Sequence, residues 1–379
     1  MDNHATTPPD PRVLDAMMPY LKEEFGNPAS TDHVYGARAA EAVEHAREQV
    51  ANAVNAKPHE IVFTSGATES DNLAIRGIAT TSSSKPAHII TCTTEHKSVL
   101  ETCRHLEKYG CSIAYTPVDR YGVIDLERLE SSITDSTVLI SVMFANNEVG
   151  TIAPVAGIGK IAKKHGIPFH TDAAQAVGHV PVDVEALGID LMSISAHKVY
   201  GPKGIGALYV RGHDPRVRLV PMVTGGGQEK GLRPGTLNVP AIVGMGKALE
   251  IASREMGEDS KRLGAWTRKM KSVFESTLGA ELNGHPSQRL PHNLNMFFRG
   301  VESKALIQSV NSQLAISASS ACTTDQVQPS HVILALGFGP ERAHCSVRFG
   351  LGRFNTAEEV DFAIGLVGNA VRRLVAIKA

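Results

Sequence analysis

The chain has 379 residues, of which 42% are hydrophobic and 20% are charged, and its formal net charge is −1. This composition is typical of a folded globular protein and excludes an intrinsically disordered chain. Because acidic and basic residues balance, we expect neither direct binding to nucleic acid nor attachment to an anionic membrane surface.

The first clear periodic segment runs from Tyr35 to Asn55, where alanine and valine recur at helical spacing and predict an amphipathic helix. Seven short apolar runs follow and predict strands at 61–63, 88–92, 112–115, 137–144, 168–171, 190–194 and 206–210. Helical segments at 72–78, 126–132 and 158–165 lie between them. Strands that alternate with helices indicate an α/β fold with a mainly parallel seven-stranded sheet, in which ligands bind at the carboxyl ends of the strands.

The pattern changes after the Gly- and Pro-rich stretch 224–240. A long helix is predicted over 241–278, and the remainder mixes strands with helices. Because a chain of this length favours two domains, we predict a large α/β domain at 12–245 and a smaller α+β domain at 1–11 and 246–379.

The segment Ser195-Ala196-His197-Lys198 follows a predicted strand. A lysine at a strand end in a polar crevice can form a Schiff base with an aldehyde cofactor. Ser195 and His197 can hydrogen-bond a phosphate from the same turn. Most lysines are solvated surface residues, so Lys198 alone is a weak indication of catalysis.

Two further segments strengthen this interpretation. Asp172 lies just past a predicted strand, where its carboxylate can pair with the pyridine nitrogen of pyridoxal phosphate, although an aspartate after a strand is more commonly a helix N-cap. The small-residue turn 64–70 also follows a strand and opens a helix, so its backbone N–H groups form an anion site. The turn lacks the spacing of a nucleotide-triphosphate loop.

Together these segments resemble those of fold-type I pyridoxal-phosphate enzymes, specifically the group I cysteine desulfurases of the NifS/IscS type. The resemblance spans essentially the whole chain and includes the segments 2–8, 26–33, 94–97, 146–150, 233–236 and 348–353. It implies that pyridoxal phosphate is the cofactor and L-cysteine the substrate. L-Cysteine would become L-alanine while its sulfur passes to a persulfide on the enzyme, for delivery to iron–sulfur cluster assembly or another thiolation pathway.

The resemblance also implies a role for each matching residue. Lys198 would hold the cofactor and remove the Cα proton, and His96 would stack on the pyridine ring and shuttle protons, although a structural loop histidine is the alternative. Asp172 would hold the ring nitrogen and Gln175 the phenolic oxygen. The remaining implied contacts are Ala67, Thr68, Ser195 and His197 at the phosphate, Thr236 at the phosphate of the neighbouring subunit, Asn147 at the cofactor, and Asn147 with Arg348 at the substrate carboxylate.

Cys322 is the implied persulfide carrier. It lies in the polar segment 317–330, which is typical of a loop, and an exposed thiol can reach the thiolate state. Ser319 replaces a glycine of the family pattern and Thr324 its last serine, and the former change reduces backbone freedom. The other cysteines lie on or beside apolar runs and are expected to be inert: Cys92, Cys103, Cys111 and Cys345.

No cysteine pair has metal-ligand spacing, so no metal site is predicted, although Cys322 could contact an iron–sulfur cluster during transfer. The odd, scattered cysteines and the lack of a signal peptide or long apolar run favour the cytoplasm. A homodimer and a sulfur-acceptor protein are the implied partners. The acceptor stays open between an iron–sulfur scaffold, tRNA thiolation and DNA phosphorothioation, and the alternatives are a selenocysteine lyase, another fold-type I enzyme, or a non-catalytic scaffold.

Overall fold

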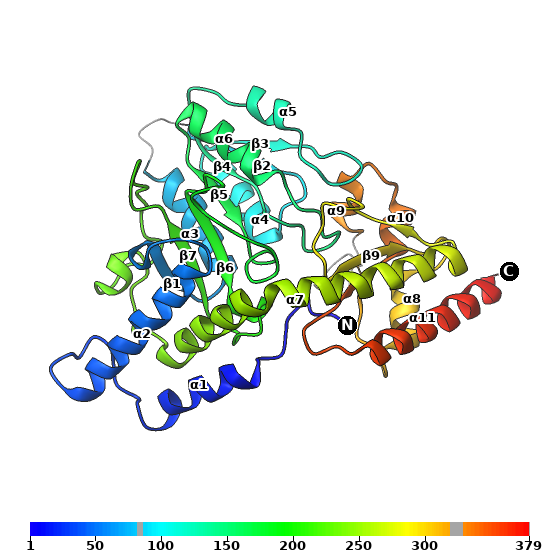
Figure 1. The fold of residues 1–379 in the computed structure, drawn as a ribbon. Helices are drawn as coiled ribbons and strands as arrows, with labels where there is room; N and C mark the ends of the chain where they lie inside the picture. Colours follow the sequence, from blue (N-terminus) through cyan, green and yellow to red (C-terminus); the bar gives the residue numbers. More distant parts are fainter. Residues whose placement is uncertain (82–85, 319–328, 379) are drawn as a thin grey trace.

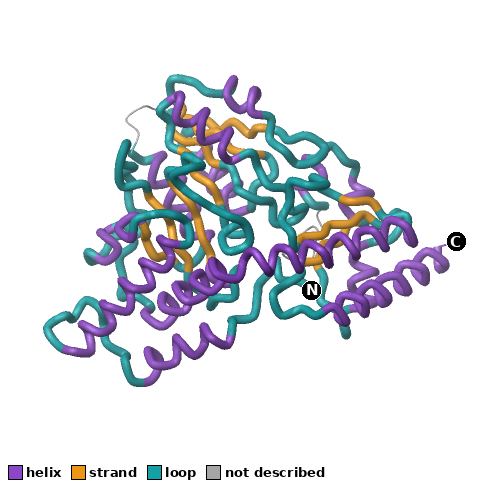
Figure 2. Tube along the Cα trace, viewed as in Figure 1, coloured by secondary structure: helices purple, strands orange, loops and turns teal. Residues whose placement is uncertain are grey.

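The computed structural model describes residues 1–81, 86–318 and 329–378. Cys322, Ser319 and Thr324 lie outside the described residues. Two sheets and their covering helices make up the described chain, as Figure 2 shows with strands in orange and helices in purple.

The larger sheet has seven strands in the order β1-β7-β6-β5-β4-β2-β3. Their bounds are β1 Ile61–Thr64, β2 His88–Cys92, β3 Ser112–Thr116, β4 Thr137–Ser141, β5 Phe169–Asp172, β6 Leu191–Ser195 and β7 Gly206–Val210. Strand β7 runs antiparallel to both its neighbours, β1 and β6, and the remaining adjacent strands pair in parallel. The predicted α/β fold with a mainly parallel seven-stranded sheet is therefore confirmed.

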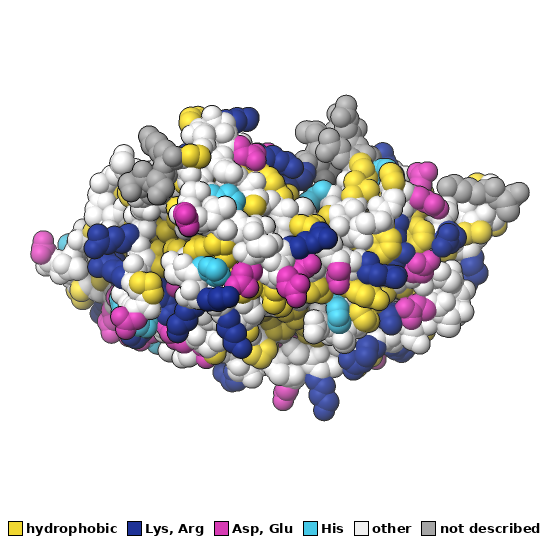
Figure 3. All heavy atoms as spheres, turned by 90° about the horizontal axis from the view of Figure 1, so that it is seen from above, with side chains coloured by type: hydrophobic (Ala, Val, Ile, Leu, Met, Phe, Trp, Pro, Cys, Tyr) yellow, Lys and Arg dark blue, Asp and Glu magenta, His cyan; other side chains and the backbone are white. Residues whose placement is uncertain are grey.

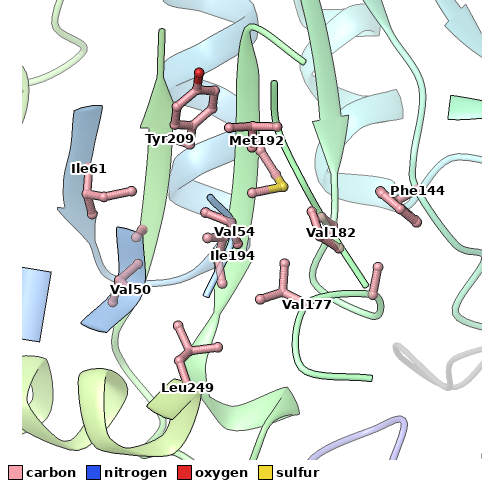
Figure 4. Close-up of a cluster of buried hydrophobic side chains, with 14 of the residues drawn as sticks. Val50, Val54, Ile61, Phe144, Val177, Val182, Met192, Ile194, Tyr209 and Leu249 are labelled. Atoms are coloured by element: carbon pink, nitrogen blue, oxygen red, sulfur yellow. The ribbon is translucent and has the colours of Figure 1, made fainter. Parts of the chain in front are cut away.

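Alternate residues of each strand face opposite sides of this sheet, so both faces need cover. Ile61 and Phe63 of β1 belong to one core and Val62 to the other. Figure 4 shows part of the first core, where Val50 and Leu249 approach the sheet from two helices. The helices around the sheet are α1 Pro11–Lys22, α2 Val34–Asn52, α3 Ala67–Ala79, α4 Lys97–Glu107, α5 Leu126–Ser131 and α6 Val155–His165.

The smaller sheet is antiparallel, in the order β10-β11-β9-β8. Its strands are β8 Glu281–Leu282, β9 Asn293–Phe297, β10 Ser317–Ala318 and β11 Ser346–Gly350, and the helices of this part are α8 Ser303–Val310, α9 His331–Ala335, α10 Pro340–His344 and α11 Ala357–Lys378. Phe274, Met296 and Phe349 lie at the centre of its separate core. The N-terminal tail joins this sheet through a parallel bridge from Asp2 to Gly350.

One long helix, α7 Val239–Leu278, connects the two parts. Its first half, up to Ala252, packs in the core of the large sheet, and Leu263, Met270 and Phe274 pack in the core of the small one. The helix extends along both parts in Figure 1. Its continuity fixes the small sheet relative to the large one, whereas the division of the chain into domains at residue 245 stays a prediction.

None of the described helices is both long and apolar enough to cross a membrane. On the face seen in Figure 3, basic and acidic side chains of the described residues are interspersed. This distribution agrees with the balanced net charge of the sequence.

Candidate active site

A cavity of about 740 Å³ lies where the carboxyl ends of the large sheet meet the edge of the small sheet. Residues that follow β1, β2, β4, β5 and β6 line it from one side, and β10, β11 and the N-terminal tail line it from the other. The predicted site residues found in its wall are Ala67, Thr68, His96, Asn147, Asp172, Gln175, Ser195, His197, Lys198 and Arg348. Thr236 is exposed and does not line this cavity.

Lys198 ends a short 3-10 turn that continues β6. Its Nζ donates hydrogen bonds to the carbonyl oxygens of His4 at 2.6 Å and Ala5 at 2.8 Å. Burial, followed by the charge of the nearby Arg348 guanidinium, lowers the pKa of Lys198 to about 8, against the opposing effect of Asp172. With that pKa, about a tenth of this amine is neutral at pH 7, which is the form that acts as a nucleophile or a base.

Asp172 is the last residue of β5. Its side chain accepts a hydrogen bond from the N–H of Ala174 at 2.9 Å, in a segment that forms turns rather than a helix, so it caps a turn and not a helix. Burial raises the pKa of Asp172, and His96 and Lys198 act in the opposite direction. A buried carboxylate of this kind needs a cationic or N–H partner, and the ring nitrogen of a pyridine can supply one.

His96 precedes the first turn of α4 and caps it. Its Nδ1 lies 3.2 Å from the N–H of Ser98 and 2.8 Å from Ser98 Oγ, and that hydroxyl donates to Asp71 Oδ2 at 2.5 Å. Burial lowers the pKa of His96, and burial followed by the Asp172 charge raises the pKa of Asp71 well above its usual range. These contacts engage Nδ1, which leaves Nε2 for a molecule in the cavity.

Asp71 and Ser98 were not predicted from the sequence as site residues. Asp71 lies inside α3 and Ser98 in the first turn of α4, 27 residues further along the chain. Both side chains are buried. A buried aspartate in the middle of a helix is the only sequence signal for this network, and it appears only once the helix has been placed.

The turn after β1 places the start of α3 at the cavity wall. Gly66 is the N-cap residue with φ 150°, a conformation that L side chains rarely adopt. The first N–H groups of α3 and the positive end of its dipole face a cavity wall that also contains Ser195 and His197. Burial, followed by the Lys198 charge, lowers the pKa of His197 to about 4, so this imidazole is neutral at pH 7.

Arg348 projects from β11 into the opposite wall. Its Nη1 donates to the backbone carbonyl of Asn147 at 2.8 Å, and its Nη2 donates to Asp2 Oδ1 at 3.1 Å. Asp2 also accepts a hydrogen bond from Ser317 Oγ at 2.7 Å. Among the described residues Arg348 Nε is buried without a hydrogen-bond partner. A guanidinium with an unused donor in a cavity wall is suited to a ligand carboxylate.

Glu148 is a second residue of this wall whose importance the sequence did not reveal. It is buried, lines the cavity and accepts a short hydrogen bond from Ser330 Oγ. Burial raises the pKa of Glu148 to about 7, against the opposing effects of Ser330 and Arg348. This carboxyl group therefore changes charge in the neutral pH range.

The described cysteines lie away from this cavity. Cys92, Cys103 and Cys345 are buried and Cys111 is half-buried. Burial raises the pKa of Cys92 and of Cys103 to about 12, so both thiols stay protonated at neutral pH and are poor nucleophiles.

The fold and the residues that line this cavity fit a pyridoxal-phosphate enzyme. The chain belongs to the aminotransferase class-V family, whose model matches residues 1–362. This family uses pyridoxal phosphate.

Similarity to individual proteins indicates one type of enzyme within this family. The chain is 51% identical over 378 residues to the cysteine desulfurase IscS of Rickettsia rickettsii (strain Iowa), a match that covers 100% of this chain and 92% of that protein. Among solved structures, a NifS-like protein superimposes with a TM-score of 0.92 at 39% identity and 98% coverage of both chains. SspA in complex with cysteine gives a TM-score of 0.83 at 38% identity, over 94% of this chain and 99% of that chain. The resemblance to NifS/IscS desulfurases is confirmed.

Proposed function

We infer that this chain is a cysteine desulfurase that acts on L-cysteine with pyridoxal phosphate as its cofactor. The active site is assigned mainly because four functional side chains line one cavity. The Lys198 amine, the Asp172 carboxylate and the His96 imidazole line it together with the Arg348 guanidinium.

The residues present fit the cofactor part by part. Pyridoxal phosphate supplies an electron-accepting ring conjugated to an aldehyde. The start of α3 with Ala67 and Thr68, together with Ser195 and His197, would hold its phosphate, which is a site of the kind that helix N-termini form for anions. Asp172 would pair with the ring nitrogen and Gln175 with the phenolic oxygen, and Lys198 would hold the aldehyde.

Arg348 would orient the substrate by its α-carboxylate. Its unpartnered Nε, with the Nη groups already fixed by Asn147 and Asp2, leaves a donor in a defined direction. We propose that Asn147 contacts both the cofactor and this carboxylate. A planar, pre-positioned guanidinium restricts the substrate to one orientation, with its Cα hydrogen directed at Lys198.

Lys198 would take the Cα proton in its neutral form, and His96 Nε2 would move the protons of the substrate thiol and amine. The Cys322 thiolate, outside the described residues, would then attack the substrate sulfur. The new S–S bond forms as the Cβ–S bond breaks, Cβ gains a proton, and Lys198 would return the proton to Cα. L-Alanine leaves, and a persulfide remains on Cys322.

We also propose a homodimer, a sulfur-acceptor protein and a cytoplasmic setting. Thr236 is exposed and lies outside the cavity of its own chain, as expected for a residue that contacts the phosphate of a neighbouring subunit. A persulfide is a carrier of sulfur and requires an acceptor, whose identity the proposal leaves open.

The test uses purified holoenzyme and L-cysteine, with alanine and protein persulfide measured together. Cys322→Ser should keep the yellow cofactor and lose persulfide formation, whereas the control Cys111→Ser should retain both. Undiminished sulfide release by Cys322→Ser in dithiothreitol would contradict the role of Cys322. Lys198→Ala should lose the visible absorbance of the bound aldehyde, and parallel assays with selenocysteine separate the desulfurase from a selenocysteine lyase.

A further inference from the structure

Three histidines form a stacked column beside the cavity, in which His4 and His292 are buried and His179 is half-buried. The rings of His4 and His292 stack with centroids 4.4 Å apart, and those of His292 and His179 stack at 4.1 Å. Loss of contact with water is the main reason why the pKa of each of these histidines is lowered, so all three rings are neutral at pH 7. Neutral stacked imidazoles act as a rigid apolar support with directed ring nitrogens.

His4, at one end of the column, contacts Gln175 in the cavity wall. His4 Nδ1 lies 2.8 Å from Gln175 Oε1, and Gln175 Nε2 donates to the carbonyl oxygen of His4 at 3.1 Å. Only the amide nitrogen can donate to that carbonyl, so the amide has one orientation. Its oxygen must then accept a hydrogen bond from His4 Nδ1–H.

The proton on Nδ1 leaves His4 Nε2 unprotonated in a neutral ring. Among the described residues this nitrogen indeed has no hydrogen-bond partner, although it is buried. The backbone of Gly350 packs closely against this ring, since a Cβ added there would lie 2.8 Å from His4 Cδ2. A buried unsatisfied nitrogen costs stability, and it is retained here together with the Nδ1 contact.

The other end of the column contacts the lysine segment. His179 Nε2 lies 2.9 Å from the carbonyl oxygen of Lys198, and His4 supplies one of the carbonyl oxygens that Lys198 Nζ contacts. Stacking therefore connects the backbone of Lys198 to the ring that orients Gln175. The two groups that would contact the aldehyde side of the cofactor share one rigid support.

We propose that His4 is a positioning residue that holds the Gln175 amide with its second N–H directed at the phenolic oxygen of bound pyridoxal phosphate. The first N–H of this amide is used by the His4 carbonyl, and its oxygen is used by His4 Nδ1. The second N–H of the amide is left as a donor, and Gln175 lines the cavity, where a ligand can accept this hydrogen bond. The inference rests on the proposed role of Gln175 and adds the residue that enforces it.

A hydrogen bond donated to the phenolic oxygen stabilises its negatively charged form and so lowers the pH at which the bound cofactor loses its proton. A net contribution typical of one hydrogen bond corresponds to a change of about half to one pH unit in that midpoint. Loss of the His4 contact lets the amide rotate, and the midpoint should rise.

The experiment is a pH titration of the visible absorbance of substrate-free holoenzyme. His4→Phe keeps the stacked ring and removes the Nδ1 donor, His4→Leu removes the donor without a ring, and His4→Asn restores a donor close to the position of Nδ1. Gln175→Leu measures the full effect of the amide. The other charged and titratable groups that line the cavity are the same in all variants: Glu69, His96, Glu148, Asp172, His197, Lys198, Lys203 and Arg348.

We expect the midpoint to rise by about half to one pH unit in His4→Phe and His4→Leu, toward the value of Gln175→Leu, and to return close to the original value in His4→Asn. A shift in Gln175→Leu without one in His4→Phe or His4→Leu would overturn the inference and leave the role of Gln175 intact. Absence of a shift in Gln175→Leu would refute the proposed role of Gln175 and the inference with it.

Discussion

Glu148→Gln should raise the free energy of unfolding, relative to that of the original protein, by more at pH 8 than at pH 5. The carboxyl group is buried and accepts a hydrogen bond from Ser330 Oγ. Glutamine has nearly the same shape, and its Oε1 can accept the same hydrogen bond. The substitution therefore removes the titration of residue 148 while it preserves its contact.

The sign follows from the direction of the pKa shift. Burial raises the pKa of Glu148 from 4.5 to about 7, so between these values the folded chain holds a proton that the unfolded chain has lost. Stability of the original protein therefore falls as the pH rises through this window. The full difference corresponds to about 3 kcal/mol, of which about 2–3 kcal/mol develops between pH 5 and pH 8.

The assay is urea unfolding of the two cofactor-free proteins at pH 3.5, 4, 5, 6, 7 and 8, with the difference in unfolding free energy plotted against pH. Glu281→Gln is the control of opposite sign, because hydrogen bonds from Arg342 lower the pKa of Glu281. That variant should be less stable than the original protein at pH 8, and the deficit should shrink below pH 4.5. A pH-independent difference for Glu148→Gln would refute the reasoning.

Three further outcomes are expected. Arg348→Lys should raise the KM for L-cysteine about 30- to 100-fold, because a single ammonium cannot replace the guanidinium fork at the carboxylate; steady-state kinetics would contradict this with an unchanged KM. Ser98→Ala should lower kcat about five- to tenfold with little change in KM, since His96 Nδ1 loses its hydroxyl contact, and Ser98→Thr should restore it. Phe274→Ala should cost about 3–5 kcal/mol in urea unfolding and leave the cofactor spectrum unchanged, because this fully buried ring lies in the small-sheet core.

Strand positions in the large sheet followed from the sequence because buried strands appear as short apolar runs between turns. The run 206–210 coincides with β7, and 88–92 with β2. The direction of a strand within the sheet cannot be predicted from such a run. A strand buried on both faces has the same composition in either direction, so the antiparallel placement of β7 between β1 and β6 required the tertiary structure.

The helix α4 was not predicted, and the reason is local. Its apolar residues Val99, Cys103 and Leu106 do recur at helical spacing, but the segment is short and the residue that caps it is histidine, which is an uncommon N-cap. Without this helix, Ser98 could not be assigned a place beside His96. One missed element therefore concealed half of the hydrogen-bond network.

Reactive side chains at strand ends could be predicted from the sequence, because a lysine, aspartate or histidine at the carboxyl end of a strand indicates a site without knowledge of its neighbours. Asp172 and Lys198 follow β5 and β6, and both line the cavity. The residues that orient these groups could not be found in this way. An orienting residue and its partner lie far apart in the sequence: His4 and Gln175 are separated by 171 residues, and Asp2 and Arg348 by 346.

The N-terminal tail explains why the orienting residues escape a reading along the chain. It runs from the small sheet, where Asp2 pairs with Gly350, across the cavity to the large sheet, where Thr7 Oγ1 donates to the His197 carbonyl at 3.0 Å. On this path its side chains and carbonyls contact Arg348, Gln175 and Lys198. The tail thus contacts the proposed groups for the carboxylate, the phenolic oxygen and the aldehyde in turn. A deletion of this segment should therefore disturb all three functions together, whereas His4→Asn should spare the contact at Gln175, because it preserves the donor on which the orientation of that amide depends.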